Sequence, residues 1–202
     1  MTAKQNSAGR KLYSVGEAYM IFFRAMYTIP GLRKGRRDGM LSGDFMERLM
    51  LAVTEVNQCA LCSYAHTKMA LESGMSREEI EALLSGDPSG VKPEEMTAYL
   101  FAQHYADSRG RPSEEAWNSV VRQYGKEKSA AILGAIRMIM MGNAYGIPLG
   151  SFLARFSGKA SDPRSSIWYE IAMLATFAVF IPCVIVNALV AALLRLPLIA
   201  FS

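Results

Sequence analysis

The sequence predicts an all-α fold with a separate hydrophobic helix near the C-terminus. Apolar residues recur at helical spacing along most of the chain, and no segment alternates with a period of two for long enough to form a strand. About half of the 202 residues are hydrophobic and one-fifth are charged, which supports a buried core. We expect three parts: an N-terminal tail 1–14, a helical domain 15–160 and a hydrophobic helix 167–197.

The first expected helix begins after Ser14. Ser14 and Glu17 have the spacing of a capping box, in which each side chain satisfies a backbone N–H near the helix start. Apolar residues continue at helical spacing to about Thr28, and Pro30 and Gly31 should then stop the helix. The basic, Gly-containing stretch that follows is expected to be a solvated loop.

The next two expected helices are separated by Asn57 and Gln58. Apolar residues recur at helical spacing over 43–56, which predicts the second helix. The third helix follows the break and ends at Gly74, because glycine readily adopts the left-handed conformation that ends many helices. This third helix carries two cysteines and a histidine.

The second half of the domain is also expected to be helical. Serine at the N-cap and proline at the first helical position mark helix starts, and glycine-rich stretches mark the stops. The expected elements are a helix from Ser76, in a capping box with Glu79, to Leu84, a helix from Pro93 to Asp107, a helix from Ser113 to Gly125, a helix over 126–141 and a turn over 142–146.

The segment Ile171–Leu194 contains no charged residue. At ~1.5 Å per residue it is about 36 Å long, enough to cross a hydrocarbon core of roughly 30 Å. Trp168 and Tyr169 precede it, where aromatic residues gather at membrane interfaces. We therefore expect a single transmembrane helix, in which Cys183 is a small apolar residue. The alternative is a helix buried in the protein or in an oligomer interface and broken at Pro182.

Charged residues favour a cytoplasmic location for the domain at the cell membrane. Arg155, Lys159 and Arg164 precede the hydrophobic segment, whereas only Arg195 follows it. The N-terminal residues lack the apolar stretch of a secretory signal. The net charge of +4 and the pI near 9.0 come without a basic stripe interleaved with aromatic residues, so nucleic-acid binding is not expected.

Cys59, Cys62 and His66 are the most informative residues of the chain. The chain has only three cysteines and two histidines, and three of these five residues lie close together here. On one helix they fall within an arc of about 60°, so they share a face. The unpaired N–H groups of a helix start stabilise a thiolate there. In the cytoplasm, a CxxC pair indicates a redox-active dithiol or a metal site rather than a structural disulfide.

Glu47 extends this pattern, because eleven residues separate it from Cys59. A glutamate, eleven residues, CxxC, three residues and a histidine resemble the signature of the AhpD-like alkylhydroperoxidases in the carboxymuconolactone decarboxylase superfamily. Cys62 and His66 occupy the remaining positions of that signature. The resemblance covers roughly residues 15–155, and it implies an all-helical domain that assembles as a homo-oligomer.

The resemblance also implies a thiol-dependent peroxidase that needs no metal or organic cofactor. Cys62 would attack the peroxide and Cys59 would resolve the product as a disulfide, while Glu47 and His66 would relay protons. A lipoyl carrier or a thioredoxin-like protein would then reduce the disulfide. Helix-dipole reasoning points partly the other way on the order of the cysteines, because the more N-terminal thiol is often the more acidic one. Leu61 stands where some relatives carry a polar residue, which leaves any auxiliary proton path there open.

Four other functions remain possible at this stage. The dithiol could exchange with the disulfide of a partner protein, or two thiolates and an imidazole could contribute to a zinc site, although a closed zinc site needs a fourth ligand. Decarboxylase or lactone chemistry is known in the superfamily, but it is not built around a CxxC pair. The chain could also be a membrane-tethered interaction protein with an inert dithiol.

Glu55 competes with Glu47 for the role of proton relay. It lies four residues before Cys59 and would share its face if one helix ran straight through Asn57. The spacing of the family signature favours Glu47. His104 is expected to be structural, because its neighbours at helical spacing are apolar.

Overall fold

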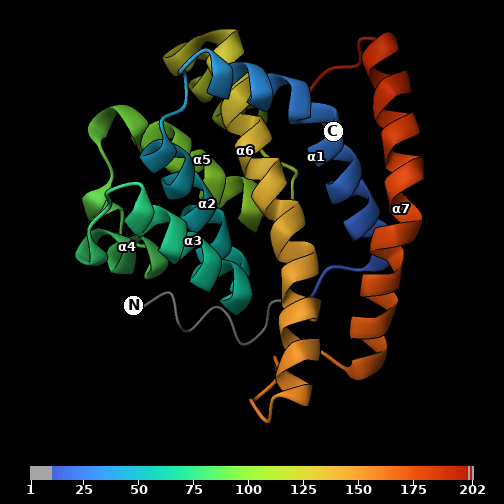
Figure 1. Cartoon of the computed structure of the whole chain (residues 1–202). Coiled ribbons are helices and arrows are strands. Elements are labelled where there is room, and N and C mark those ends of the chain that lie inside the picture. The colour runs from blue at the N-terminus through green and yellow to red at the C-terminus, as the bar shows by residue number, and fades with distance from the viewer. Residues whose placement is uncertain (1–10, 200, 202) are drawn as a thin grey trace.

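The computed structural model describes residues 11–199 and 201, and this part of the chain contains helices and no strand (Figure 1). The fold class predicted from the sequence is therefore confirmed. Residues 1–10 of the predicted N-terminal tail lie outside the described residues. The elements are α1 (Val15–Arg37), α2 (Gly43–Asn57), α3 (Ala60–Glu72), α4 (Arg77–Leu84), the short 3₁₀ helices η3 (Pro88–Gly90) and η4 (Pro93–Glu95), α5 (Met96–Asp107), α6 (Glu114–Phe156) and α7 (Ile167–Leu193).

Helix α6 is the centre of the fold. It contacts α2, α3 and α5 on one side and α1 and α7 on the other, so the remaining long helices pack around it (Figure 1). Its inward face is apolar, and Ile132, Ile136 and Met140 are completely or almost completely buried. The hydrophobic core therefore lies along α6, with the cysteine-bearing helix α3 against its second half.

Helix α1 continues through Pro30, so the predicted stop and the predicted basic loop after it are wrong. Close packing on α6 explains the difference, because small residues bring the two backbones together. A Cβ atom at Gly134 would lie 2.8 Å from Leu32 Cβ, and a Cβ atom at Gly35 would collide with Ala131. This packing outweighs the single backbone hydrogen bond that a proline removes.

Helix α6 likewise continues through the predicted turn at 142–146. Buried Asn143 stabilises this stretch, since its carbonyl oxygen accepts a hydrogen bond from Thr54 Oγ1 at 3.3 Å and its amide donates to the Val53 carbonyl at 3.4 Å. The predicted end at Gly125 is real as a local break, because Gly125 has φ 73° and ψ 166° inside the helix. Two predicted helices thus form one kinked element that reaches Phe156.

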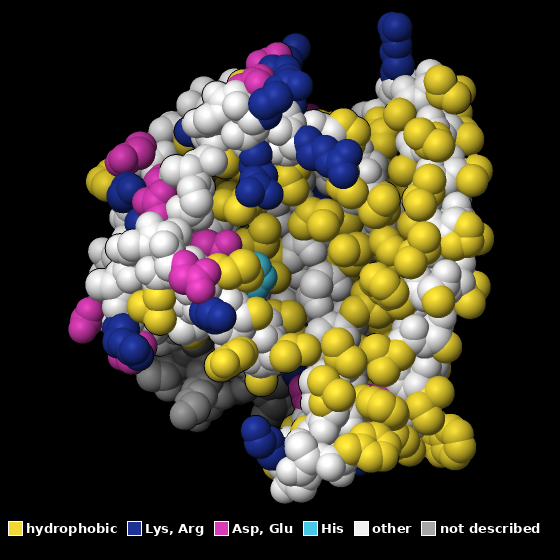
Figure 2. Space-filling model, viewed as in Figure 1, with side chains coloured by type: hydrophobic (Ala, Val, Ile, Leu, Met, Phe, Trp, Pro, Cys, Tyr) yellow, Lys and Arg dark blue, Asp and Glu magenta, His cyan; other side chains and the backbone are white. Residues whose placement is uncertain are grey.

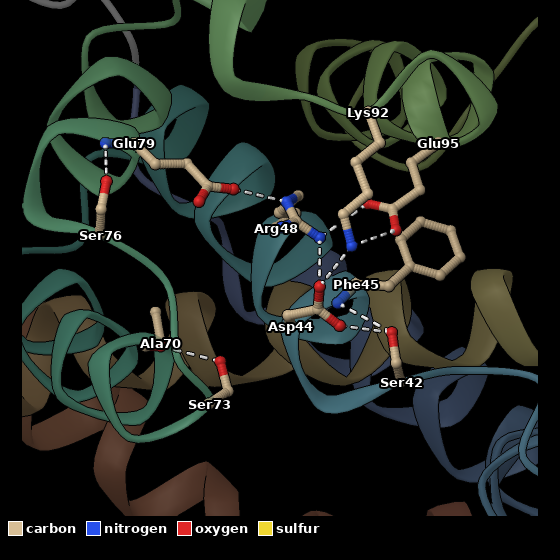
Figure 3. A network of polar contacts seen from close by, with 10 residues as sticks. All are labelled: Ser42, Asp44, Phe45, Arg48, Ala70, Ser73, Ser76, Glu79, Lys92 and Glu95. Atoms are coloured by element: carbon tan, nitrogen blue, oxygen red, sulfur yellow. Dashed lines mark hydrogen bonds and ion pairs between the residues drawn. The ribbon is translucent and has the colours of Figure 1, made fainter.

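An ion-pair network attaches the first turns of α2 to α4 and η4 (Figure 3). The Arg48 side chain is only 5% exposed, and it donates to Glu79 at 2.7 Å and to Asp44 and Glu95 at 2.9 Å. Ser76 caps α4 as predicted, but the Glu79 carboxylate accepts from Arg48 and does not complete a capping box. The network surrounds a buried arginine with three carboxylates and fixes the position of α2.

Helices α6 and α7 are both long and apolar enough to cross a membrane, judged by length and composition. The most apolar stretch of α6 is mostly buried in the fold, so this stretch is part of the core. Helix α7 contacts α1 and α6 through a narrow stripe that contains Met173, Val184 and Ala191. Its other faces are apolar and exposed, and hydrophobic side chains cover that side of the molecule while charged ones gather over the α2–α4 side (Figure 2).

Candidate active site

The break between α2 and α3 places Cys59 at the start of a helix. Gln58 has φ 57° and ψ 50°, a left-handed conformation that ends α2. Cys59 is the N-cap of α3, and its Sγ atom accepts a hydrogen bond from the backbone N–H of Cys62 at 3.2 Å. The sulfur therefore occupies the place that a serine or aspartate oxygen takes at other helix starts. A negative charge on this sulfur is favoured by the same N–H groups.

Cys59 and Cys62 form a disulfide, with their Cα atoms 5.2 Å apart. Cys59 is completely buried, whereas 8% of the Cys62 surface is exposed. Cys62 Sγ lies 3.5 Å from the carbonyl oxygen of Gly142, which can accept the thiol hydrogen in the reduced form. The third cysteine, Cys183, is exposed on α7 and has no disulfide partner.

His66 and Glu47 form a buried pair between α3 and α2. Nδ1 of His66 lies 2.8 Å from Oε2 of Glu47, and the side chains are 15% and 7% exposed. An ionised Glu47 is an acceptor only, so Nδ1 carries the proton and Nε2 is left as the basic nitrogen. His66 follows Cys62 by one helical turn, so both side chains lie on the same face of α3. The arrangement provides a base beside the dithiol and a carboxylate that stabilises its protonated form.

Glu55 does not share a helix with the cysteines. It belongs to α2, which ends at Asn57, and the left-handed Gln58 changes the chain direction before Cys59. The straight helix that would place Glu55 on the dithiol face is therefore absent. The structure brings Glu47, and not Glu55, into hydrogen-bond contact with His66.

Gly146 is a site residue that the sequence reasoning missed. A Cβ atom there would lie 2.6 Å from Cys62 Sγ and 2.9 Å from Cys59 Sγ, so only glycine lets α6 approach the disulfide this closely. Gly142, Gly146 and Gly150 are spaced by four residues and share one helix face. This spacing is the signal in the sequence, although Gly142 and Gly146 also fit the turn predicted over 142–146.

A cavity of about 440 Å³ lies beside Gly146. It lies between the start of α3, the second half of α6 and the segment that joins α6 to α7, and Gly146 is the lining residue that also contacts the two sulfur atoms. The lining combines apolar surface with a few polar side chains, as is common for small-molecule sites. Representative lining residues are Gln58, Leu61, Gly146, Ser151 and Lys159.

His104 lies at the end of α5, outside this constellation. Its Nε2 atom accepts a hydrogen bond from the backbone N–H of Ser113, the N-cap of α6, at 3.1 Å. This contact joins the end of α5 to the start of α6. Within residues 11–199 and 201, no three or more His, Cys, Asp or Glu side chains are grouped so that they could hold a metal ion.

The fold and the site together define a class: an all-helical domain that carries a CxxC dithiol and a Glu–His pair at a helix start. Residues 23–104 match the model of the carboxymuconolactone decarboxylase family, so this part of the chain is similar to that family. The matched segment runs from α1 to α5 and contains Glu47, Cys59, Cys62 and His66. Comparisons of the chain with curated proteins and with solved structures found no match.

Proposed function

We propose that the domain is a thiol-dependent alkyl hydroperoxidase. The observation that carries this proposal is the placement of Cys59 and Cys62 at bonding distance on the first turn of α3, one turn before a histidine that is held by a buried glutamate. The matched family includes AhpD-like peroxidases as well as decarboxylases, and the dithiol favours the peroxidase.

The proposed reaction consumes one peroxide and two thiols. The Cys62 thiolate attacks the terminal oxygen of ROOH, the O–O bond breaks, and RO⁻ takes a proton from the His66 imidazolium to give ROH. Cys62 is then a sulfenic acid. Cys59 attacks the Cys62 sulfur, the S–O bond breaks, and hydroxide leaves with the Cys59 proton as water. The two electrons that reduce the peroxide are those of the dithiol, which ends as a disulfide.

Glu47 and His66 supply the proton path in this scheme. His66 takes the proton from the Cys62 thiol before the attack and returns it to the leaving alkoxide, so one group serves both steps. Glu47 accepts the Nδ1–H hydrogen bond, which orients the ring and stabilises its positive charge. Glu47 therefore acts through His66, as a positioning residue.

Two features support Cys62 as the attacking thiol. It is the partly exposed cysteine of the pair, and it lies one turn from His66 while Cys59 is completely buried. The hydrogen bond from the Cys62 N–H to Cys59 Sγ acts in the opposite direction, because it stabilises a thiolate on Cys59. We give more weight to access, since a buried thiolate cannot meet a peroxide.

The experiment is peroxide consumption by the full chain with Cys183→Ser as the reference, so that only the dithiol remains. Hydrogen peroxide and cumene hydroperoxide are compared with dihydrolipoamide or a thioredoxin-like protein as reductant. We expect turnover in Cys183→Ser, a loss of two thiols per chain after peroxide treatment, and no turnover in Cys59→Ser or Cys62→Ser. A constant thiol count under peroxide would refute the proposal.

Trapping of the sulfenic acid with dimedone identifies the attacking cysteine. In the Cys183→Ser background, Cys59→Ser leaves Cys62 without its resolving thiol and should give one dimedone adduct at Cys62. Cys62→Ser should give none. An adduct that forms only on Cys59 would reverse the assignment.

A second function, dithiol–disulfide exchange with a partner protein, is favoured by the surface of α3. Tyr64 is 75% exposed, and Leu61 and Met69 on the same helix are also exposed. Exposed aromatic and apolar side chains beside a dithiol suit a protein partner better than a small peroxide. Fast reduction of protein disulfides without peroxide turnover would favour this function, and the Tyr64→Ser variant should then slow it.

We further propose that α7 anchors the domain to the cytoplasmic side of the cell membrane and that the domain works as a homo-oligomer. The exposed apolar faces of α7 and its lack of charged residues beyond Glu170 support the anchor. The excess of basic residues before the helix supports the orientation. Alkaline carbonate extraction of membranes, and sedimentation of the detergent-solubilised chain, test the two statements separately.

A further inference from the structure

A second cavity, of about 310 Å³, lies where the end of α7 and the segment after it pack on α1 and α6. None of its lining residues lines the cavity beside the dithiol. The segment after α7 closes it, because Tyr27 donates a hydrogen bond to the Leu196 carbonyl and Arg137 donates to the Leu198 carbonyl. Peroxidase chemistry at the dithiol gives this cavity no role.

Arg137 is buried in this cavity wall without a carboxylate. The residue is 3% exposed, its Nε donates to Tyr105 Oη at 2.8 Å, and its Nη2 donates to the Leu198 carbonyl at 2.6 Å. Its Nη1 atom is buried and has no hydrogen-bond partner within the described residues. Burial lowers the pKa of Arg137, since the charged form loses its hydration.

Arg24 brings a second guanidinium group to the same cavity. Its Nη1 donates to the Gly110 carbonyl at 2.9 Å, which is a neutral acceptor. Among the described lining residues there is no aspartate or glutamate, so neither positive charge is balanced there. Arg48 shows the contrast within the same chain, because three carboxylates surround that equally buried arginine (Figure 3).

Two cations at an apolar cavity cost free energy unless an anion joins them. Arg24 and Arg137 both line the cavity, and the positive charge and N–H donors of a guanidinium group favour a carboxylate. The cavity therefore has the chemistry to hold one small anionic group.

The rest of the lining is apolar and indicates what the anionic group is attached to. At the ~30 Å³ that a water molecule occupies in the liquid, the cavity holds about ten non-hydrogen atoms, more than a bare anion needs. An apolar chain attached to the anion would cover the remaining wall. The apolar wall consists of Met20, Phe23, Leu196, Pro197, Leu198 and Ile199.

We propose that this cavity binds a single-chain carboxylate of the fatty-acid class, with its head on Arg137 and Arg24 and its chain against the apolar wall. The small size of a carboxylate suits the limited volume, and its negative charge balances the guanidinium groups that line the cavity. The site does not include the dithiol, so binding at this cavity and the proposed peroxidase activity can be tested separately.

The test uses the full chain in micelles of an uncharged maltoside detergent, with decanoate labelled with ¹³C at the carboxyl carbon as the probe. We expect a bound carboxyl resonance whose pKa lies below that of decanoate in protein-free micelles, because two guanidinium groups stabilise the ionised head. Partition into a micelle alone shifts that pKa upward, so the sign separates binding from partition.

Matched variants locate the site. Arg137→Met should weaken decanoate binding at least tenfold, and Arg24→Met should weaken it as well if Arg137→Met fails to fold. Arg33→Met removes an exposed arginine of α1 that does not line the cavity, and it should leave binding unchanged. Equal binding by Arg33→Met and by both cavity variants would overturn the proposal.

Competitors define the head group and the chain. Decanol should displace decanoate at least tenfold less well than unlabelled decanoate does, because it has no charge. Displacement by inorganic phosphate alone would overturn the need for an apolar chain, and tighter binding of decyl phosphate would overturn the carboxylate. Absence of any bound carboxyl resonance would refute the proposal.

Discussion

At the scale of single residues, the dithiol site depends on the absence of a side chain at Gly146. Gly146 leaves room for both sulfur atoms against α6, and a single added methyl group would lie 2.6 Å from Cys62 Sγ. Distances below about 3 Å between a carbon and a sulfur atom require the helices to move apart. The contact between α3 and α6 is thus set by a glycine.

Gly146→Ala should destabilise the oxidised protein, with Gly142→Ala as its matched control. Both substitutions improve helix propensity, by up to about 1 kcal/mol. A Cβ atom at Gly142 meets only Ile139 at 3.6 Å, whereas the one at Gly146 meets two sulfur atoms. Thermal unfolding in micelles should show Gly146→Ala less stable than Gly142→Ala by about 1–3 kcal/mol. Equal stability of the two variants would show that α6 does not contact the disulfide.

Glu47→Gln should lower the turnover number about 10²-fold, because the imidazolium loses the charge that stabilises it while the geometry is kept. Glu55→Gln removes a carboxylate from the same helix and should retain full turnover. A loss confined to Glu55→Gln would move the relay to that residue.

At the scale of elements, an ion pair connects the start of α1 to the turn after α5. Arg109 donates to Glu17 at 2.7 and 3.0 Å, and this hydrogen bond, with the Ser14 capping contacts, lowers the pKa of Glu17 to about 2. Glu17 also completes the capping box of α1. The Glu17 carboxylate therefore caps the start of α1 and also pairs with Arg109 from a distant part of the chain.

The stability contribution of Glu17 should depend on pH in a definite direction. A carboxyl group whose pKa is lowered by folding stabilises the folded state above its ordinary pKa of 4.5, and that stabilisation is lost as the pH falls towards 2. Wild type should therefore exceed Glu17→Gln in thermal stability at pH 6, and the difference should shrink below pH of about 4.5. Glu81→Gln, at an exposed position of α4, should show a small difference that does not vary in this way.

Local signals in the sequence predicted the helix starts, and the ends near Gly74, Leu84 and Asp107 were also right. Ser14, Ser76 and Ser113 each cap a helix as expected, because a cap is a contact within four residues. The stops expected after Thr28 and at 142–146 failed because packing on a distant helix decides them. The site shows the same contrast between local signals and distant packing. Its motif was visible in the sequence, whereas the role of Gly146 and the cavity beside it depend on how α3 packs on α6.

At the scale of the whole molecule, the exposed apolar surface lies on one side. Helix α7 lies along α1 and α6 and presents Val186 and Leu189 outward, and the charged side chains gather elsewhere (Figure 2). A membrane or a second copy of the chain can cover such a face. If the membrane covers it, the whole domain lies close to the lipid surface.

Val186→Glu combined with Leu189→Glu should release the chain from membranes, because two charges on the lipid-facing side cost several kcal/mol. Arg122→Glu changes the net charge by the same amount at an exposed position on α6 and should stay membrane-bound. Flotation with vesicles measures both. Release without loss of turnover supports the anchor, whereas an unanchored wild type whose dimer dissociates in the double variant would assign the face to an oligomer interface.

The N-cap position of Cys59 connects the oxidation state of the dithiol to the start of α3. The Cys59 sulfur that accepts the Cys62 N–H is bonded to Cys62 Sγ in the disulfide and is a free thiol after reduction, so oxidation or reduction of the dithiol changes the acceptor that caps α3. The first turn of α3 also carries Leu61 and leads to Tyr64, which are exposed to any approaching reductant. A change in the oxidation state of the dithiol should therefore change the stability of this helix end.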